Sequence, residues 1–323
     1  MAPRNHSNST ITSDFIKFPT TVDELTTRVL GFIVILLSSP GLYFNISVFF
    51  HFLSIPKTSF YLMCISKTVS NSLILLVNLL YNGPCAILDT ILGSDFANRH
   101  LNQAIGFGVY LMGPLTQVLV AINRFLVVWR SVTNHSSKAG TIATVTTLFV
   151  LWLVALYFST RIGLSNPCIA NVTSSWNTLA ESCENSILLY LIFKNFTYCF
   201  IFSGVFSNSL NLLVAMKLAQ IACKTDVISS ESAKQRHRST VRLFSQSCIQ
   251  DWIYVADMVK SLYISKRFLD DVIISFLTGI GTNVAVHMAD GFVMFIFHYG
   301  ASKKKRRDST TTISKVLPFD SNE

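Results

Sequence analysis

The sequence is divided by long intervals that carry no formally charged side chain. Five of these intervals run for 21 to 28 residues, and a sixth runs for 18 residues before it reaches Asp290. A helix needs about 20 consecutive apolar residues to cross the hydrocarbon core of a bilayer. The intervals are continuously apolar and do not alternate, so they predict membrane-spanning helices rather than the strands of a barrel. They cover residues 29–56, 68–88, 100–123, 139–160, 195–216 and 272–289.

The composition favours a polytopic membrane protein over other classes. Of the 323 residues, 50% are hydrophobic and 13% are charged, whereas a soluble domain carries about 25% charged residues. A disordered chain would need low hydrophobicity and high charge. The net charge of +9 would also suit a nucleic-acid binder, but the basic residues lie between the apolar intervals and in the tail, where membrane topology explains them. We therefore expect membrane lipids, and no nucleic acid, as partners.

A seventh span is predicted in spite of its charges. The segment 242–264 carries Asp251, Asp257 and Lys260, and a charge at mid-membrane costs about 2.5–3.5 kcal/mol on the translocon scale. The loop before this segment is basic and the loop after it is short, so omitting the span would move the basic tail to the other face. The expected fold class is an all-α membrane protein, a seven-transmembrane helix bundle. Its spans are predicted at 29–53, 60–84, 102–128, 141–163, 187–215, 242–264 and 270–299.

The Lys and Arg residues predict the orientation of the bundle. With the N-terminus outside, 16 of them lie in inner segments and 8 in outer segments, as the positive-inside rule requires. The glycosylation sequons at Asn5, Asn8 and Asn171 then fall outside, and the sequon at Asn134 falls inside. The expected parts are an extracellular tail at 1–28, the seven-span domain at 29–300 and a cytoplasmic basic, Ser/Thr-rich tail at 301–323.

The tail and the intramembrane charges each have two interpretations. The basic cluster at 303–307 is a signal for topology and anionic lipid, or it adjoins phosphorylation sites at 309–312 that reverse the local charge. Lys67, Asp251 and Asp290 need partners or water within the membrane. They form a polar network that rearranges on activation, or static pairs that fix helix register. Asp257 and Lys260 are three residues apart, as are His287 and Asp290, and these spacings favour pairing or packing.

Catalytic, cofactor and metal motifs are missing from the sequence. It contains no P-loop, no GxGxxG, no GxSxG and no CxxC pair, and its seven histidines have no metal-ligand spacing. We therefore expect no enzyme activity, no cofactor and no metal. A transporter or channel is the alternative to a receptor, although it would predict repeats, broken helices or rings of pore charges. A membrane enzyme would need convergent catalytic residues.

Asn123, Arg124 and Phe125 stand at the inner end of the third span. An arginine there is a snorkelling cation at the interface, or a switch residue that bonds within the bundle in one state and meets a cytoplasmic partner in another. The seven spans, the orientation and this Asn-Arg-Phe motif resemble a rhodopsin-like G-protein-coupled receptor, in which Asp-Arg-Tyr is usual. Gly41 and Asn45 resemble the first helix of that superfamily.

The closer resemblance is to the nematode serpentine chemoreceptors of class X, and it extends over roughly residues 29–300. It implies coupling to a heterotrimeric G protein through Asn123, Arg124 and Phe125, and a small environmental ligand. It also implies location in the plasma membrane and the cilium of a sensory neuron. The segments that resemble this family are 59–71, 113–117 and 121–125, together with Gln250-Asp251 and the stretch 287–291.

Several features depart from the rhodopsin-like pattern. Residues 187–299 contain no proline, so proline kinks are unavailable as hinges in the last three helices. Asp290-Gly291 stands where Asn-Pro is usual, and Asn123 cannot form the ionic lock that an Asp would give Arg124.

Disulfide and ligand residues complete the prediction. The resemblance implies a disulfide between Cys168 and Cys183 within the second outer loop. The alternative is two free thiols, which an oxidising compartment disfavours. Tyr110 and Gln117 in the third span and Tyr190 in the fifth are suggested as ligand contacts. The suggestion rests only on their position along the span and on the side of the helix they occupy, and such residues also pack helices together.

Overall fold

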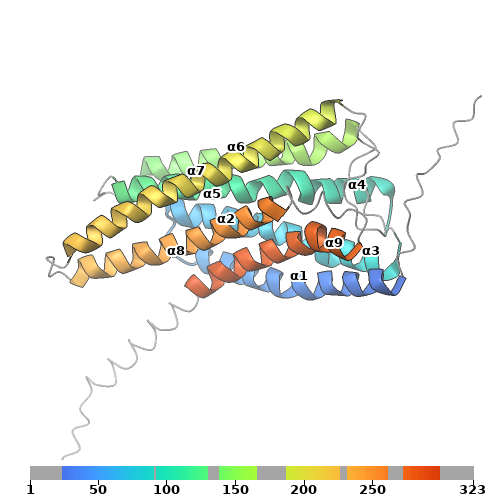
Figure 1. The fold of residues 1–323 in the computed structure, drawn as a ribbon, viewed down its shortest axis with the longest axis horizontal. Helices are drawn as coiled ribbons and strands as arrows, with labels where there is room; N and C mark the ends of the chain where they lie inside the picture. The colour runs from blue at the N-terminus through green and yellow to red at the C-terminus, as the bar shows by residue number, and fades with distance from the viewer. Residues whose placement is uncertain are drawn as a thin grey trace, which may run out of the picture.

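The fold is an elongated bundle of helices that run along a common long axis (Figure 1). The structure is a computed structural model and describes residues 24–90, 92–129, 138–165, 187–225, 231–260 and 272–298. Within these ranges every regular element is helical. The α-helices are α1 (Glu24–Leu53), α2 (Ser59–Val77), α3 (Gly83–Leu88), α4 (Asp95–Gln103), α5 (Val109–Trp129), α6 (Lys138–Ser165), α7 (Ile187–Thr225), α8 (Glu231–Val259) and α9 (Val272–Phe276).

Among the described residues, three π-helical segments join shorter helices into continuous rods. Asn78–Asn82 joins α2 to α3, Ala104–Gly108 joins α4 to α5, and Leu277–Gly281 joins α9 to a final helix over 282–298. Side chains define two of the helix starts, because Thr58 accepts a hydrogen bond from the Tyr61 amide and Ser94 accepts one from the Ala97 amide. Such N-caps satisfy amides that have no partner within the helix.

Six rods are long and apolar enough to cross a membrane, and each overlaps one of the six uncharged intervals. This agreement confirms the sequence prediction for those spans. The ends differ by a few residues, since polar residues extend a helix beyond its apolar part. The candidate spans are Glu24–Leu53, Ser59–Leu88, Phe96–Trp129, Lys138–Thr160, Tyr198–Ile221 and Leu277–His298.

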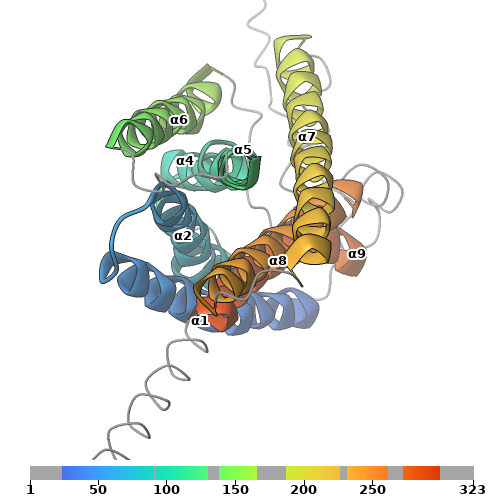
Figure 2. The same ribbon diagram turned by 90° about the vertical axis from the view of Figure 1, so that its left-hand side faces the viewer.

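The seventh rod, α8, is too polar to pass as a span by hydropathy, yet it packs against α5 and α7 within the bundle (Figure 2). Its polar residues face inward: Gln246 and Asp251 are buried, whereas Ile249 and Trp252 are exposed. A polar interior with an apolar exterior is the arrangement that a helix needs in lipid. The predicted span at 242–264 can therefore lie in a membrane because its polar side chains point into the bundle and its apolar side chains point outward. The last residues of this span lie outside the described ranges.

The bundle is layered along its axis. We name its two ends after Glu24, where α1 begins, and Arg124, which lies near the end of α5. One apolar cluster lies toward the Glu24 end and another toward the Arg124 end, and buried polar residues of α1, α2 and the 282–298 helix separate them. The first cluster includes Leu30, Val34, Leu75, Phe276 and Val284, and the second includes Val48, Phe52, Phe60, Met63 and Met294.

Candidate functional site

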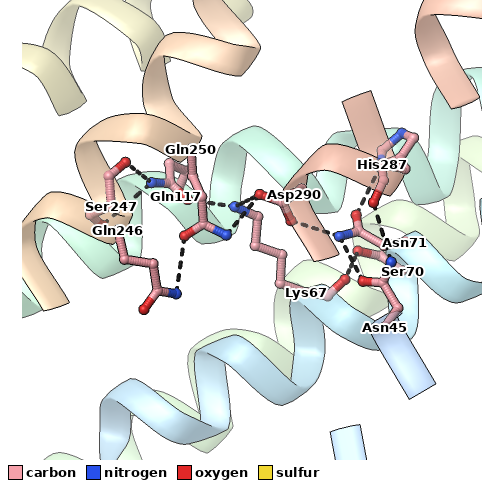
Figure 3. A network of polar contacts seen from close by, with 10 residues as sticks. All are labelled: Asn45, Lys67, Ser70, Asn71, Gln117, Gln246, Ser247, Gln250, His287 and Asp290. Atoms are coloured by element: carbon pink, nitrogen blue, oxygen red, sulfur yellow. Dashed lines mark hydrogen bonds and ion pairs between the residues drawn. The ribbon is translucent and has the colours of Figure 1, made fainter. Parts of the chain in front are cut away.

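The polar layer is built around an ion pair between α2 and the 282–298 helix. Lys67 Nζ lies 2.7 Å from Asp290 Oδ1, and the two side chains are only 2% and 0% exposed (Figure 3). Asp290 also accepts hydrogen bonds from Asn71 Nδ2 at 2.6 Å and from Gln250 Nε2 at 2.8 Å. A buried ion pair is tolerated when further hydrogen bonds satisfy its remaining atoms. This carboxylate meets that requirement with donors from three helices.

Lys67 is held equally firmly on its other side. Its ammonium donates to Gln117 Oε1 on α5 at 2.7 Å and lies 5.0 Å from the centroid of the Tyr254 ring on α8. Gln117 in turn donates through Nε2 to the Ser247 carbonyl at 3.1 Å. The lysine therefore contacts α5, α8 and the last helix from its own position on α2, and a shift of any of these helices changes its contacts.

The network continues from the ion pair toward the Glu24 end. Asn71 donates to Asn45 Oδ1 at 3.2 Å, and its own oxygen lies 2.8 Å from His287 Nδ1. Asn45 donates to the His287 carbonyl at 3.2 Å. A Cβ on Gly291 would collide with the Asn45 amide, so the glycine is what allows α1 to approach the last helix here.

In the other direction the network reaches the Arg124 end. Gln250 accepts a hydrogen bond from Gln246 at 3.3 Å, and Gln246 Oε1 lies 2.8 Å from His298 Nε2. His287 and His298 stand on the same helix, eleven residues or roughly 16 Å apart. One connected set of polar contacts thus extends along about three turns of this helix.

Asp251 was predicted to share a polar network with Lys67 and Asp290, and both Lys67 and Gln117 of the network interact with its carboxylate. Its carboxylate accepts from Asn211 Nδ2 on α7, so it links α7 to α8. Helical spacing places Ser203, Ser207 and Asn211 on one face of α7, and all three are buried.

Arg124 is buried at its end of the bundle, with 7% of its surface exposed. Its guanidinium lies 4.8 Å from the centroid of the Phe60 ring. Within the described residues its Nε and Nη2 atoms have no hydrogen-bond partner, and no carboxylate lies within ion-pair distance of it. A cavity of about 70 Å³ adjoins it, lined by α2, α5, α7 and α8. Its neighbours Asn123 and Phe125 differ, since Asn123 lines this cavity and Phe125 stacks on Trp129.

A second polar cluster lies on the Glu24 side of the layer. Tyr110 on α5 donates to Asp257 on α8, whose other oxygen lies 2.7 Å from Lys260 Nζ. The Tyr110 ring stacks on the Phe200 ring of α7, with 5.5 Å between the ring centroids. It also makes an edge-to-face contact with the His287 ring, with 5.7 Å between the centroids. The expected pairing of Asp257 with Lys260 is therefore present. His287 uses Nδ1 for Asn71 and not for Asp290, which stands one turn further along its helix.

Of the three residues suggested as ligand contacts, only Tyr110 lies in this cluster. Gln117 lies at the centre of the network. Tyr190 belongs to α7, but its side chain lies outside the described part of the chain. Four described cysteines, Cys64, Cys85, Cys199 and Cys248, are unpaired. Outside the described residues lie Cys168, Cys183, Asn5, Asn8, Asn171 and the tail from 299 onward.

Several residues of the network were not predicted from sequence. They include Gln246, Ser247, Tyr254, Asn211 and His298. The signal that would have found them is helical spacing of amides and hydroxyls: Gln246 and Gln250 are four residues apart, as are Ser207 and Asn211. The spans were predicted from intervals without charged residues. Uncharged polar residues such as Gln, Asn and Ser lie inside those intervals, so this criterion does not identify them.

Comparisons with known proteins agree with this architecture. Residues 35–298, well over half of the chain, match the family described as serpentine type 7TM GPCR chemoreceptor Srx. Among solved structures, the crystal structure of squid rhodopsin is similar, with a TM-score of 0.68 over 93% of this chain and 90% of that chain. The two sequences are 15% identical, so this similarity concerns the fold alone. None of the curated proteins matches the chain.

Proposed function

Because the chain belongs to the Srx family of serpentine 7TM GPCR chemoreceptors, we propose that it couples a small external chemical to nucleotide exchange on a heterotrimeric G protein through Arg124. The protein is a G-protein-coupled chemoreceptor with the rhodopsin fold, and neither family nor fold favours a transporter. In the proposed orientation the Glu24 end faces outward and the Arg124 end faces the cytoplasm of a cell with this receptor in its plasma membrane. A sensory cilium is the proposed site.

The observation that carries this proposal is the environment of Arg124. A guanidinium has five donors, and leaving several of them buried without acceptors is unfavourable. A partner that supplies carbonyl or carboxylate oxygens in the adjoining cavity would satisfy them. The partner therefore binds more tightly to the conformation in which this cavity is open. Such a difference in affinity between two conformations is what coupling requires.

The opposite end supplies the proposed ligand site. Tyr110, Asp257 and Lys260 join α5 to α8 by the contacts given above, and Tyr190 stands on α7 toward the same end. A ligand that changes these contacts shifts α8 relative to α5. Gln117 and Lys67 carry the shift into the polar layer. Ligand and G protein then favour the same arrangement, so the binding of each strengthens that of the other.

The test is ligand-stimulated nucleotide exchange with Arg124→Ala. We expect the stimulated rate to fall roughly tenfold or more, equivalent to about 1.4 kcal/mol of lost coupling free energy. Surface expression should stay unchanged, because the substitution removes an uncompensated buried charge. Arg28→Ala is the matched control, since Arg28 is exposed at the opposite end and forms an ion pair with Glu24 on its own helix. Measurable solute flux without coupling to any G protein would contradict the proposal.

A further inference from the structure

A small cavity lies between α5, α7 and α8, and it is open on one side. Its volume is about 30 Å³. One water-sized species occupies roughly 10–15 Å³ on this measure, so the cavity has room for a chemical group of roughly one or two heavy atoms but not for a complete organic ligand. Its polar lining consists of Gln117 on α5, of Ser203, Ser207 and Asn208 on α7, and of Asp251 and Tyr254 on α8.

The buried part of this lining contains two hydroxyl groups without partners. Ser207 and Tyr254 are only 2% and 9% exposed. Within the residues that the structure describes, Ser207 Oγ and Tyr254 Oη form no hydrogen bond. A buried hydroxyl without a partner is unfavourable. This part of the cavity therefore favours an occupant that forms hydrogen bonds.

The open side of the cavity lies at the seam between α7 and α8. The lining there includes Gly204, Val255 and Met258, which are half-buried. Nearby residues on the outer surface of the bundle are apolar and exposed, among them Val205 at 61% and Trp252 at 65%. The cavity thus opens between these two helices toward the outer surface of the bundle.

This opening lies at the depth of the acyl chains. Ser207 is the tenth residue of the candidate span Tyr198–Ile221, which places it roughly 14 Å along the helix in a hydrocarbon core about 30 Å thick. Acyl chains offer no hydrogen-bond donor or acceptor at this depth, so the surrounding lipid leaves Ser207 and Tyr254 unsatisfied. A molecule dissolved in the bilayer can satisfy them if it carries a polar head.

The charges around the cavity indicate that this head is neutral. Asp251 contributes a carboxylate, but Lys67 already attracts it, and Gln117 and Asn211 donate hydrogen bonds to it. A further cation is therefore not required. An anion in the cavity would be repelled by the same carboxylate.

We propose that this cavity binds the head of an uncharged, lipophilic molecule that enters from the bilayer between α7 and α8. The head is a single hydroxyl or carbonyl group, and it forms hydrogen bonds with Ser207 and Tyr254. The apolar remainder of the molecule stays in the lipid beside Val255 and Met258, because the cavity is too small to enclose it.

Phe200 connects this cavity to the Tyr110 cluster. It lines the cavity, and its ring stacks on the Tyr110 ring with 5.5 Å between the centroids. An occupant of the cavity therefore acts on a contact between α5 and α7 that adjoins the proposed ligand site. The signalling effect of such an occupant rests on the proposed function, whereas its binding is measured without a G protein.

The experiment is photolabelling of the purified full-length receptor in lipid nanodiscs. The probe is octan-1-ol with a diazirine group on its chain, and peptide mass spectrometry locates the label. We expect saturable labelling of α7 and α8 around Gly204 and Met258. Unlabelled octan-1-ol should compete at least about fivefold more strongly than n-octane at equal mole fraction in the lipid, because the alkane lacks the hydrogen-bonding head.

Two substitutions test the opening and the head separately. A Cβ on Gly204 would lie 3.9 Å from the Val255 side chain and 4.0 Å from that of Met258, so Gly204→Leu fits across the opening and should reduce the saturable labelling to background. Ser207→Ala leaves the opening unchanged. It removes one hydrogen bond and should raise the octan-1-ol concentration for half-maximal competition about fivefold.

Gly140→Leu is the matched control, because Gly140 is exposed on α6 and a Cβ there would meet nothing within 4 Å. This variant should be labelled like the wild type. If Gly204→Leu fails to fold, Ser207→Ala decides the question.

Three results overturn the proposal. The first is labelling spread over all the lipid-facing helices without saturation, or concentrated at Tyr110 and not at the α7–α8 seam. The second is equal competition by n-octane and octan-1-ol, which would show that no head group is recognised. The third is labelling that both cavity substitutions leave unchanged. Loss of G-protein coupling with labelling intact would contradict the proposed function alone.

Discussion

Lys67 and Arg124 are both buried cations, but their surroundings differ. Lys67 has a carboxylate and an amide oxygen at 2.7 Å, and it is the centre of a network. Arg124 lies against the Phe60 ring. The first environment is satisfied within the bundle, which suits a residue that transmits a shift. The second suits a residue whose partner comes from outside.

The Lys67–Asp290 pair predicts a characteristic pattern of substitutions. Lys67→Met should destabilise the receptor by about 3–5 kcal/mol, because it leaves the Asp290 carboxylate buried without a cation. Adding Asp290→Asn removes that charge and should restore more than half of the loss. The measurement is a double-mutant cycle of unfolding free energies in bilayer discs.

The control for this cycle is Lys138→Met, an exposed lysine at the start of α6, which should change stability by less than about 0.5 kcal/mol. Equal destabilisation of the single and double variants would show that the two side chains do not interact.

At the scale of elements, the last helix bends without a proline. The absence of prolines from 187–299 makes proline kinks unavailable as hinges in the last three helices. The structure instead places a π-helical segment at Leu277–Gly281, where Gly279 leaves helical backbone geometry. A π-helical segment interrupts the regular hydrogen-bond ladder just as a proline does. The prolines inside candidate spans lie earlier in the chain: Pro40 in α1, Pro84 in α3 and Pro114 in α5.

The packing of the π-helical segment Ala104–Gly108 on α6 depends on one glycine. A Cβ on Gly108 would collide with the Ala155 carbonyl and the Ser159 hydroxyl, whereas a Cβ on Gly106 would meet nothing within 4 Å. Gly108→Ala should therefore destabilise the receptor by about 1–3 kcal/mol through overpacking. Gly106→Ala, in the same π-helical segment, is the control.

The measurement for this pair is the unfolding free energy of each variant beside the wild type. Gly106→Ala should be neutral or slightly stabilising, since alanine loses less backbone entropy than glycine. Comparable destabilisation by both substitutions would mean that the π-helical geometry, and not contact with α6, requires glycine.

At the scale of the whole molecule, the proposed orientation places both ends of the chain on opposite sides of the membrane. It predicts N-glycans at Asn5, Asn8 and Asn171 and none at Asn134. Removing the three outer sequons together should abolish the mobility shift that a glycosidase produces on the expressed receptor, and removing Asn134 should leave it unchanged. Glycosylation at Asn134 would reverse the orientation and with it the assignment of Arg124 to the cytoplasm.

The outer loop carries a second proposal at this scale. We keep the disulfide between Cys168 and Cys183 as an implication of family resemblance. Cys64, Cys85, Cys199 and Cys248 are unpaired, and the bridge itself lies outside the described residues. The bridge between Cys168 and Cys183 would be seen as a single linked peptide after non-reducing proteolysis.

The sequence by itself determined six of the membrane spans and roughly where they lie. Transfer of an apolar segment into lipid is a local property that adds up over about 20 consecutive residues, so it can be read without knowing any neighbour. It also identified Lys67, Asp251 and Asp290 as charges that need partners.

Only the tertiary structure decided which partners they have. Asn71 and Asp290 meet across 219 residues of sequence, and Asp251 joins α7 through Asn211. Such contacts depend on the rotation of each helix about its own axis, and that rotation is set by packing against several other helices at once. The helix α8 shows the same limit of sequence-based prediction. It has a buried polar face and an exposed apolar face, and a hydropathy averaged over the helix identifies neither face.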